Sequence, residues 1–287
     1  MMITTKGAVV VTGASTGIGK ACALQLDKLG FQVFAGVRNP ADAEMLKSQA
    51  SHRLTPIWLD ITDAVSIAAA VETINKAVGD LGLWGLVNNA GIAVVSPLEC
   101  LAIAELRQQM EVNVIAQIAV TQAFLPLLRR SQGRIVNIGS IIGKMAMPFL
   151  GSNSAAKFAM EAFTDVLRME LQPWGISVSI IEPSYVATPI WERAVTTTNK
   201  TVKDLPPEAK DLYGTATAAA CESVIKSGKN GISADMVAQS VVNALTTKRP
   251  KTRYLVGKEA KFVDLMIKFL PDRIRDRVII GQTAKGT

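Results

Sequence analysis

The sequence has few of the residues that build metal centres, disulfide frameworks or base-stacking platforms. Its 287 residues include one histidine and three cysteines, and aromatic residues make up only 5%. The cysteines, Cys22, Cys100 and Cys221, stand far apart, and their odd number argues against a disulfide framework. The single histidine, His52, has no second His and no Cys nearby. Neither a metal site nor a Ser–His pair is therefore expected.

The sequence also lacks a long apolar run. No window reaches the roughly 18 uninterrupted apolar residues of a membrane span. No secretory leader or targeting segment is visible ahead of the first strand-like run, which begins at Ala8. Together with the cysteine pattern, these absences predict a protein of the reducing cytoplasm.

Net positive charge is confined to one end of the chain. Residues 248–285 contain eleven Lys or Arg and four Asp or Glu, a difference of seven that equals the whole formal net charge of +7. A surface that follows nucleic-acid phosphates needs clustered cations beside stacking aromatic rings. The neutral body of the protein is therefore not expected to bind nucleic acid.

Short apolar runs alternate with longer amphipathic stretches over most of the chain. Apolar residues make up 49% of the sequence, which is enough for a large core in one domain covering residues 1–287. The alternation predicts an α/β fold, a single-domain doubly wound parallel sheet of the Rossmann type with helices on both faces. Strands are expected at Val9–Thr12, Gln32–Gly36, Leu54–Leu59, Leu83–Asn88, Arg134–Ile138 and Ser177–Glu182, and helices at 17–29, 41–49, 62–78, 104–130 and 153–172.

The regular alternation ends after Pro183. Residues 189–230 are predicted to form a substrate lid, followed by a helix capped by Ser233 and a last strand near Lys251–Val256. Residues 258–280 form a basic amphipathic segment. Such a segment usually packs on its own domain or on a partner subunit, and contact with an anionic membrane is the less favoured alternative.

A glycine-rich turn follows the first predicted strand. Because ligands of such sheets bind at the carboxyl ends of the strands, this turn is where a pyrophosphate would meet a helix N-terminus. Glycines there allow the sharp turn and the close approach of the backbone. The residues predicted to form this dinucleotide site are Gly13, Ser15, Thr16, Gly17, Ile18 and Gly19. The alternative interpretation is an ordinary turn between strand and helix.

Arg38 follows the second predicted strand, where NAD-binding proteins carry a carboxylate for the ribose 2′-hydroxyl. The run Gly36-Val37-Arg38-Asn39 contains no acid, and a guanidinium there suits a 2′-phosphate. NADP is therefore favoured over NAD. The alternative for Arg38 is a solvated surface charge.

These motifs resemble the short-chain dehydrogenase/reductase family, and in particular its hydroxysteroid- and retinol-handling members. The resemblance rests on Thr12-Gly13-x-x-x-Gly17-Ile18-Gly19, Asn88-Asn89-Ala90-Gly91, Asn113, Ser140, Lys157 and the run from Pro183 to Thr188. It implies an NAD(P)-dependent oxidoreductase that interconverts an alcohol and a ketone. It also implies further cofactor contacts from Asp60, Ile61, Asn89, Ala90, Gly91, Lys157, Pro183, Val186 and Thr188.

The resemblance assigns chemical roles to three polar residues. Ser140 would polarise the substrate carbonyl, Asn113 would hold a water in a proton relay, and Lys157 would lower the pKa of a tyrosine four residues before it. In this sequence that tyrosine position is occupied by Asn153. A carboxamide does not titrate, so the loss of a positioned general acid is expected to cost roughly 10²–10⁴-fold in rate.

Three explanations of Asn153 are left open by the sequence. In the first explanation, Asn153 is a deliberate substitution in an ordinary oxidoreductase. In the second, a natural enzyme uses another proton donor, and the candidates are Ser140, Lys157 acting through water, and Tyr185. The third explanation is a different class of protein on the same fold. That protein would be a non-redox isomerase, lyase or cyclase, or a sensor or scaffold that binds NADP.

Apolar residues gather in the segments that would face the substrate. Residues 92–97, residues 141–150 and the predicted lid supply Val94, Val95, Met145, Met147, Phe149, Leu150, Ile190 and Trp191. Such a lining suits a bulky apolar substrate, although each residue alone fits an ordinary core equally well. Two predicted helices, 104–130 and 153–172, resemble those with which the family forms homodimers and homotetramers.

Overall fold

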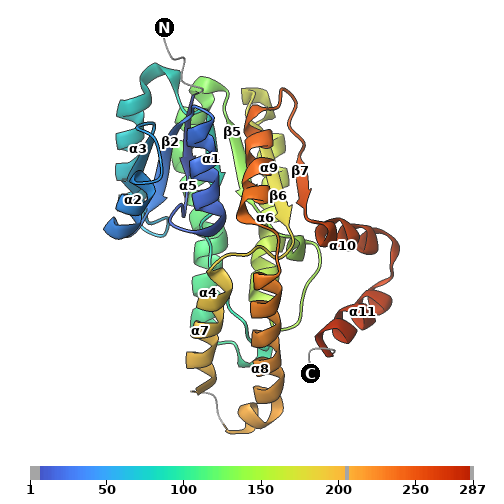
Figure 1. Ribbon diagram of the computed structural model, residues 1–287. Coiled ribbons are helices and arrows are strands. Elements are labelled where there is room, and N and C mark those ends of the chain that lie inside the picture. The colour runs from blue at the N-terminus through green and yellow to red at the C-terminus, as the bar shows by residue number, and fades with distance from the viewer. Residues whose placement is uncertain (1–6, 204–206, 285–287) are drawn as a thin grey trace.

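The computed structural model describes residues 7–203 and 207–284, which form a parallel sheet covered by helices on both faces (Figure 1). Its strand order is β3-β2-β1-β4-β5-β6-β7, and every neighbouring pair is parallel. The strands are β1 (Ala8–Val11), β2 (Gln32–Val37), β3 (Leu54–Trp58), β4 (Gly85–Asn88), β5 (Arg134–Ile138), β6 (Ser177–Pro183) and β7 (Arg253–Val256). The predicted doubly wound α/β fold is confirmed.

Alternate strand residues supply the two halves of the core. In β1, Val9 and Val11 join one hydrophobic cluster, whereas Ala8 and Val10 join the cluster on the opposite face. This alternation follows from the two-residue period of a strand, and it explains why the strands read as continuous apolar runs.

Eleven α-helices lie in the described part of the chain. Residues of α1 and α9 pack on one face of the sheet, and those of α3 and α5 pack on the other. The helices are α1 (Gly17–Lys28), α2 (Pro40–Lys47), α3 (Ala64–Val78), α4 (Ile103–Met110), α5 (Ala116–Ser131), α6 (Gly151–Glu170), α7 (Ile190–Lys203), α8 (Pro207–Lys229), α9 (Ala234–Thr246), α10 (Lys258–Phe269) and α11 (Asp272–Ala284). The Ser233 hydroxyl caps α9 as expected, accepting a bond from the Met236 N–H at 3.3 Å.

The long helix expected over 104–130 is interrupted. A π-helical segment, Glu111–Ile115, separates α4 from α5 and contains Asn113. Such bulges widen a helix by one residue and often lie at functional sites. Hydrophobic periodicity over so long a stretch does not reveal the interruption, because the apolar stripe continues on both sides of it.

The region predicted as a lid is helical over most of its length. Figure 1 shows α7 and α8 side by side, extending away from the sheet below its strand-end edge. The sequence assigned no helix or strand to 189–230, because the Thr and Lys residues of α7 and α8 leave only a narrow buried stripe. Lid movement stays a prediction.

One helical stretch, Ile103–Ser131, is long and apolar enough to cross a membrane by length and composition alone. Half of its most apolar window is buried inside the fold. Its polar residues Asn113 and Gln117 bond to the loop after β4. Packing of this stretch against the sheet therefore accounts for its hydropathy.

Candidate active site at the strand ends

The turn after β1 has the geometry of a pyrophosphate cradle. Gly13 and Gly17 have φ angles of +63° and +56°, a backbone region that favours glycine. Helix α1 begins at Gly17 with no acidic residue in its first turn, and the Thr16 side chain forms no capping bond. The first N–H groups of α1 therefore remain free to bind an anion. Ser15, Thr16 and Ile18 lie in the same turn.

Close packing fixes this turn against two other strand ends. A Cβ atom on Gly13 would lie 2.8 Å from the Ala90 Cα, and one on Gly17 would lie 2.9 Å from the Thr188 side chain. Residues from the ends of β4 and β6 thus meet the glycine turn, as the prediction of a shared strand-end site requires.

Thr12 and Asn89 tie the loop after β4 to the glycine turn. The Thr12 hydroxyl accepts bonds from the N–H groups of Asn89 (2.9 Å) and Ala90 (3.0 Å). The Asn89 amide donates to the carbonyls of Thr12 and Gly13 at 2.8 and 3.0 Å. Asn89 therefore supports the cradle from behind, and Ala90 and Gly91 continue along the edge of the site.

Arg38 and Asp60 lie together at the ends of β2 and β3. An Arg38 guanidinium nitrogen is 3.6 Å from an Asp60 carboxylate oxygen, and the Arg38 side chain is 65% exposed. Partial burial alone would raise the pKa of Asp60. Hydrogen bonds from Thr62 and the Arg38 charge outweigh it and hold that pKa below its usual value. The other Asp60 oxygen accepts from the Thr62 N–H at 3.0 Å, whereas the helix that follows, α3, is capped by the side chain of Asp63.

Asn113 is held by the loop after β4. Its side-chain oxygen accepts from the Ile92 N–H and its amide donates to the Ile92 carbonyl, both at 2.8 Å. Asn113 lies in the π-helical segment, and such segments are frequent at functional sites. One turn later, Gln117 donates to the Ala90 carbonyl at 2.7 Å.

Ser140 stands directly after β5 and starts the short helix η4 (Ile141–Gly143). Its hydroxyl lies 3.4 Å from both the Pro183 carbonyl and the Ile142 N–H. These long contacts leave the hydroxyl available to a substrate oxygen. Pro183 ends β6, and Val186 beyond it pairs with Ile232.

Asn153 and Lys157 lie one turn apart on the same face of α6. The Lys157 ammonium donates to the Ile138 carbonyl at 2.7 Å. Burial lowers the pKa of Lys157 to about 8, and the Glu161 carboxylate acts in the opposite direction. Asn153 is 5% exposed. It is thus buried one turn before a lysine whose pKa is lowered toward neutrality by burial.

A buried ionic cluster stands behind this face. Arg253 on β7 lies 3.0 Å from Glu161 and 3.3 Å from Glu182, and Lys144 lies 3.1 Å from Glu182. Burial and the neighbouring Glu182 carboxylate raise the pKa of Glu161 to about 7. Lys144 also bonds to Asp264 of α10 at 3.0 Å. The cluster connects α6, the Ser140 loop and the C-terminal helices.

Tyr185 lies on the substrate side of the site. Its ring contacts Trp191 with the centroids 5.1 Å apart, and it packs in the same apolar cluster as Val95 and Leu150. Burial raises the pKa of Tyr185. Six of the eight apolar residues predicted to line a pocket meet in this cluster. They are Val95, Met147, Phe149, Leu150, Ile190 and Trp191, whereas Val94 and Met145 lie outside it.

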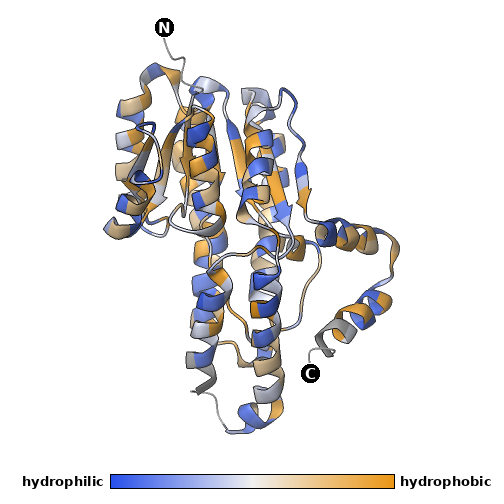
Figure 2. Cartoon of the chain, viewed as in Figure 1, coloured by the Kyte–Doolittle hydropathy of each residue, from blue (hydrophilic) through white to orange (hydrophobic). Residues whose placement is uncertain are grey.

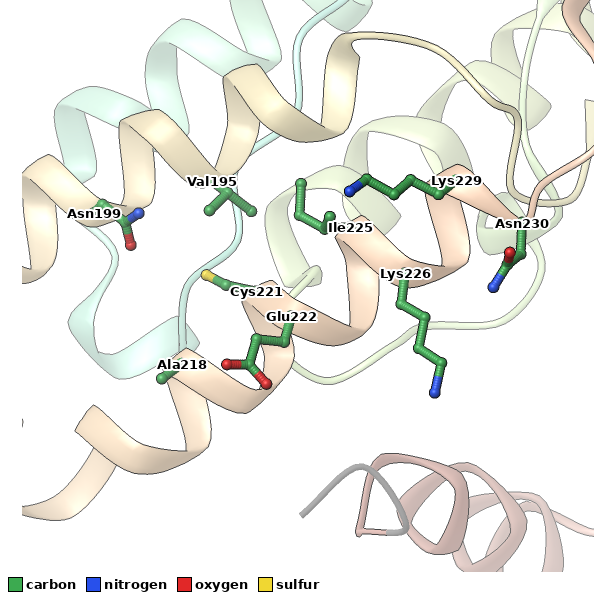
Figure 3. A pocket seen from close by; sticks show the side chains of 9 residues that line it. All are labelled: Val195, Asn199, Ala218, Cys221, Glu222, Ile225, Lys226, Lys229 and Asn230. Carbon is green, nitrogen blue, oxygen red and sulfur yellow. The ribbon is translucent and has the colours of Figure 1, made fainter.

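A groove of about 570 Å³ runs between α7 and α8 (Figure 3). Val195 and Asn199 line one side, and residues from Ala218 to Asn230 line the other. Cys221 belongs both to this groove and to the apolar cluster around Tyr185. The groove therefore borders the substrate side rather than the cofactor cradle.

Several residues that hold the candidate site in place were not predicted from the sequence. Thr12, Gln117 and the carboxylates Glu161 and Glu182 carry the contacts that hold the site. The sequence did contain a signal for Gln117, because Asn113, Gln117 and Thr121 form a polar stripe at helical spacing in an otherwise apolar stretch. In the described residues, no three His, Cys, Asp or Glu side chains gather as a metal site would require.

The fold and the strand-end geometry define a dinucleotide-binding oxidoreductase, and comparison with known proteins identifies its family. The short chain dehydrogenase family model matches residues 7–199. The 17-beta-hydroxysteroid dehydrogenase type 6 of Bos taurus is 40% identical over 277 residues, covering 94% of this chain and 87% of that protein. Retinol dehydrogenase 5 of Mus musculus is 38% identical over 277 residues with the same coverage. The chain belongs to the short-chain dehydrogenase/reductase family and is an NAD(P)-dependent dehydrogenase or reductase.

Solved structures with this fold contain either dinucleotide. A short chain dehydrogenase from Burkholderia cenocepacia in complex with NADP is 25% identical, with a TM-score of 0.72 over 97% of this chain and 98% of that one. A short chain dehydrogenase/reductase from Burkholderia phymatum in complex with NAD is 20% identical, with a TM-score of 0.79 over 93% and 95%. The second comparison concerns the fold alone. The choice between NADP and NAD therefore has to be argued from this chain's own residues.

Proposed function

We propose that this protein uses NADP(H) to interconvert an alcohol and a ketone on a bulky apolar substrate, with Asn153 in place of the usual tyrosine slowing the chemistry. The observation that carries the proposal is the α6 face, where Asn153 is buried one turn before a lysine whose pKa lies near neutrality. The binding machinery is present, and the group that normally titrates is replaced.

The residues at the strand ends fit a bound dinucleotide. The glycine turn leaves no room for a Cβ at Gly13 or Gly17, and the first turn of α1 offers free N–H groups. NADP is proposed because β2 ends without a carboxylate and the Arg38 guanidinium is exposed beside Asp60. When bound, the nicotinamide supplies or accepts a hydride.

The chain's own residues then manage the substrate oxygen and its proton. The Ser140 hydroxyl is placed to hydrogen-bond the carbonyl, and the Asn153 amide is able to donate a second hydrogen bond but no proton. Lys157 is proposed as the proton source, acting through a water held with the help of Asn113. Its pKa near 8 matches the working range of a general acid.

The other two candidate donors fit less well. Burial raises the pKa of Tyr185, away from the range of a general acid, and its ring packs among apolar side chains. The Ser140 hydroxyl is proposed to hydrogen-bond the substrate oxygen, and an aliphatic hydroxyl does not titrate in the range of a general acid. Tyr185 is therefore proposed as a substrate-facing packing residue.

The proposal also covers the oligomeric state of the protein and its location in the cell. A homodimer or homotetramer is supported by exposed apolar side chains on α4, the π-helical segment and α6. They include Ile103, Ile115, Phe163 and Met169. The free thiols of Cys22, Cys100 and Cys221 are compatible with the proposed cytoplasmic location.

Two assays test this function. Fluorescence titration with NADPH and NADH is expected to show tighter binding of NADPH, and Arg38→Asp is expected to remove that preference. Oxidation of NADPH with a panel of bulky apolar ketones is expected to be slow but measurable. Binding of NADPH with no turnover of any ketone would instead favour a non-redox catalyst or a binding protein.

A further inference from the structure

Glu161 is a buried carboxylate on α6, one turn after Lys157. The spacing of four residues places both side chains on the same face of the helix. One Glu161 oxygen lies 3.0 Å from the Arg253 guanidinium. The other is buried and has no hydrogen-bond partner within residues 7–203 and 207–284. Burying a carboxylate in this way is unfavourable for the fold, so its place beside Lys157 points to a function.

One arginine serves three carboxylates around Glu161. Arg253 lies 2.7 Å from Asp165 and 3.3 Å from Glu182 in addition to its contact with Glu161. The charge of Glu161 is therefore only partly compensated by Arg253. The charged groups of this region come from five parts of the chain, and they are Lys157, Asp165 and Arg168 on α6, Lys144 after η4, Glu182 on β6, Arg253 on β7, and Asp264 and Lys268 on α10.

The surroundings of Lys157 and Glu161 are tightly packed and largely apolar. A Cβ atom on Gly143 would lie 2.9 Å from the Lys157 carbonyl oxygen and 3.3 Å from the Glu161 Cγ atom, so the Ser140 loop presses on this face of α6. Figure 2 shows the strands beneath in mostly hydrophobic colours. Charges in such surroundings interact more strongly than in water.

We propose that Glu161 is a positioning residue whose carboxylate keeps Lys157 in its ammonium form, so that a proton is available for the substrate oxygen. This inference rests on the proposed function, in which Lys157 is the proton source. Burial lowers the pKa of Lys157 to about 8, and the Glu161 carboxylate opposes that shift. Because burial and Glu182 raise the pKa of Glu161 only to about 7, Glu161 is ionised where Lys157 titrates.

The pH dependence of Lys157 labelling in the full chain tests the inference without any turnover. The probe is reductive methylation by formaldehyde and a borane, which modifies only the neutral amine, and peptide mass spectrometry measures its rate at Lys157. The Lys157 side chain is partly exposed, so the small reagent reaches it. We expect a midpoint near pH 8 in the unaltered chain. In Glu161→Gln the midpoint should fall by about one pH unit.

Three further variants separate the charge of Glu161 from its packing. Asp165→Asn removes another acid from the same arginine but lies one turn further from Lys157, and it should leave the midpoint unchanged. Glu161→Asp keeps the charge and should keep the midpoint close to that of the unaltered chain. Glu161→Met is a second charge-free variant of similar size, which gives the same test if the glutamine variant does not fold.

Two labelling results would overturn the inference. The first is an unchanged midpoint in the charge-free variants, and the second is an equal shift in Asp165→Asn, which would indicate a general loosening of the cluster. Single-turnover ketone reduction over the same pH range tests the proposed function separately. A shifted labelling midpoint beside a flat reduction profile would support the effect of Glu161 on Lys157 and count against Lys157 as the proton source.

Discussion

The cofactor edge and the catalytic face of α6 differ in how completely they keep the family pattern. At the cofactor edge, the glycine turn, Asn89 and Thr12 form a closed set of contacts. On α6, Lys157 is retained while the neighbouring position carries Asn153. From this difference we infer that binding a dinucleotide and transferring a proton rest on separate groups of residues, which the predictions below test.

The polar residues around Asn153 nevertheless keep their hydrogen bonds. Asn113 keeps both of its bonds to Ile92, and Lys157 keeps its bond to the Ile138 carbonyl. Neither contact involves the side chain at position 153. In the proposed function, Asn153 takes the place of a titrating group in an otherwise intact arrangement, and the following predictions test that separation.

The largest effect is expected from Lys157→Met. This change removes the proposed proton source, so single-turnover reduction of a ketone should slow by roughly 10²–10⁴-fold. NADPH affinity should fall far less, because the glycine turn is untouched. Lys76→Met, at an exposed lysine of α3, is the control. An unchanged rate would remove Lys157 from the mechanism.

Gly19→Ala tests the other side of the comparison. A Cβ at this position would lie 2.3 Å from the Gly13 carbonyl oxygen and 2.4 Å from the Asn89 amide. The turn must shift, and the loss of charge-assisted bonds to a phosphate should weaken NADPH binding about 100-fold. Gly214→Ala, in open space on α8, is the same substitution without a clash. Equal affinity in both variants would contradict the cradle.

The pH dependence should follow Lys157. Its pKa is lowered to about 8, so the protonated donor predominates below pH 8 and is lost above it. Ketone reduction should therefore fall about tenfold per pH unit above 8, while alcohol oxidation, which needs the neutral amine, should rise up to about pH 8 and level off above it. Stopped-flow rates over this range measure both directions. A flat profile for reduction would argue against a titrating donor there.

The smallest effect is expected from Tyr185→Phe. The Tyr185 ring is partly buried among apolar side chains and packs against Trp191. Turnover should change by less than about twofold, because packing is kept and no donor is removed. A large loss of rate with normal KM would instead make Tyr185 the proton donor.

Much of the fold was predictable because apolar residues repeat with different periods in strands and in helices. Six strands and a last one near Lys251–Val256 were predicted from apolar runs, and the structure contains all seven. The two helices at 190–229 were missed because their Thr, Lys and Ala residues leave only a narrow buried stripe. The π-helical turn at Asn113 was missed because one extra residue barely shifts an apolar pattern.

The motif residues of the candidate site were predicted better than the residues that hold them in place. Arg38, Asp60, Ser140 and Lys157 all lie at the strand-end edge where they were expected. The ionic cluster of Lys144, Glu161, Glu182 and Arg253 was not foreseen, because its members are separated by up to 109 residues in the chain. Charged residues that meet only through tertiary packing leave no local pattern in a single sequence.

The most direct measurement compares this chain with Asn153→Tyr, purified identically. NADPH affinity and the single-turnover rate with an apolar ketone are determined for both. We expect equal affinities and a rate roughly 10²–10⁴-fold higher in the tyrosine variant. Equal rates, or a loss of NADPH binding on introducing the tyrosine, would contradict the separation of cofactor binding from proton transfer.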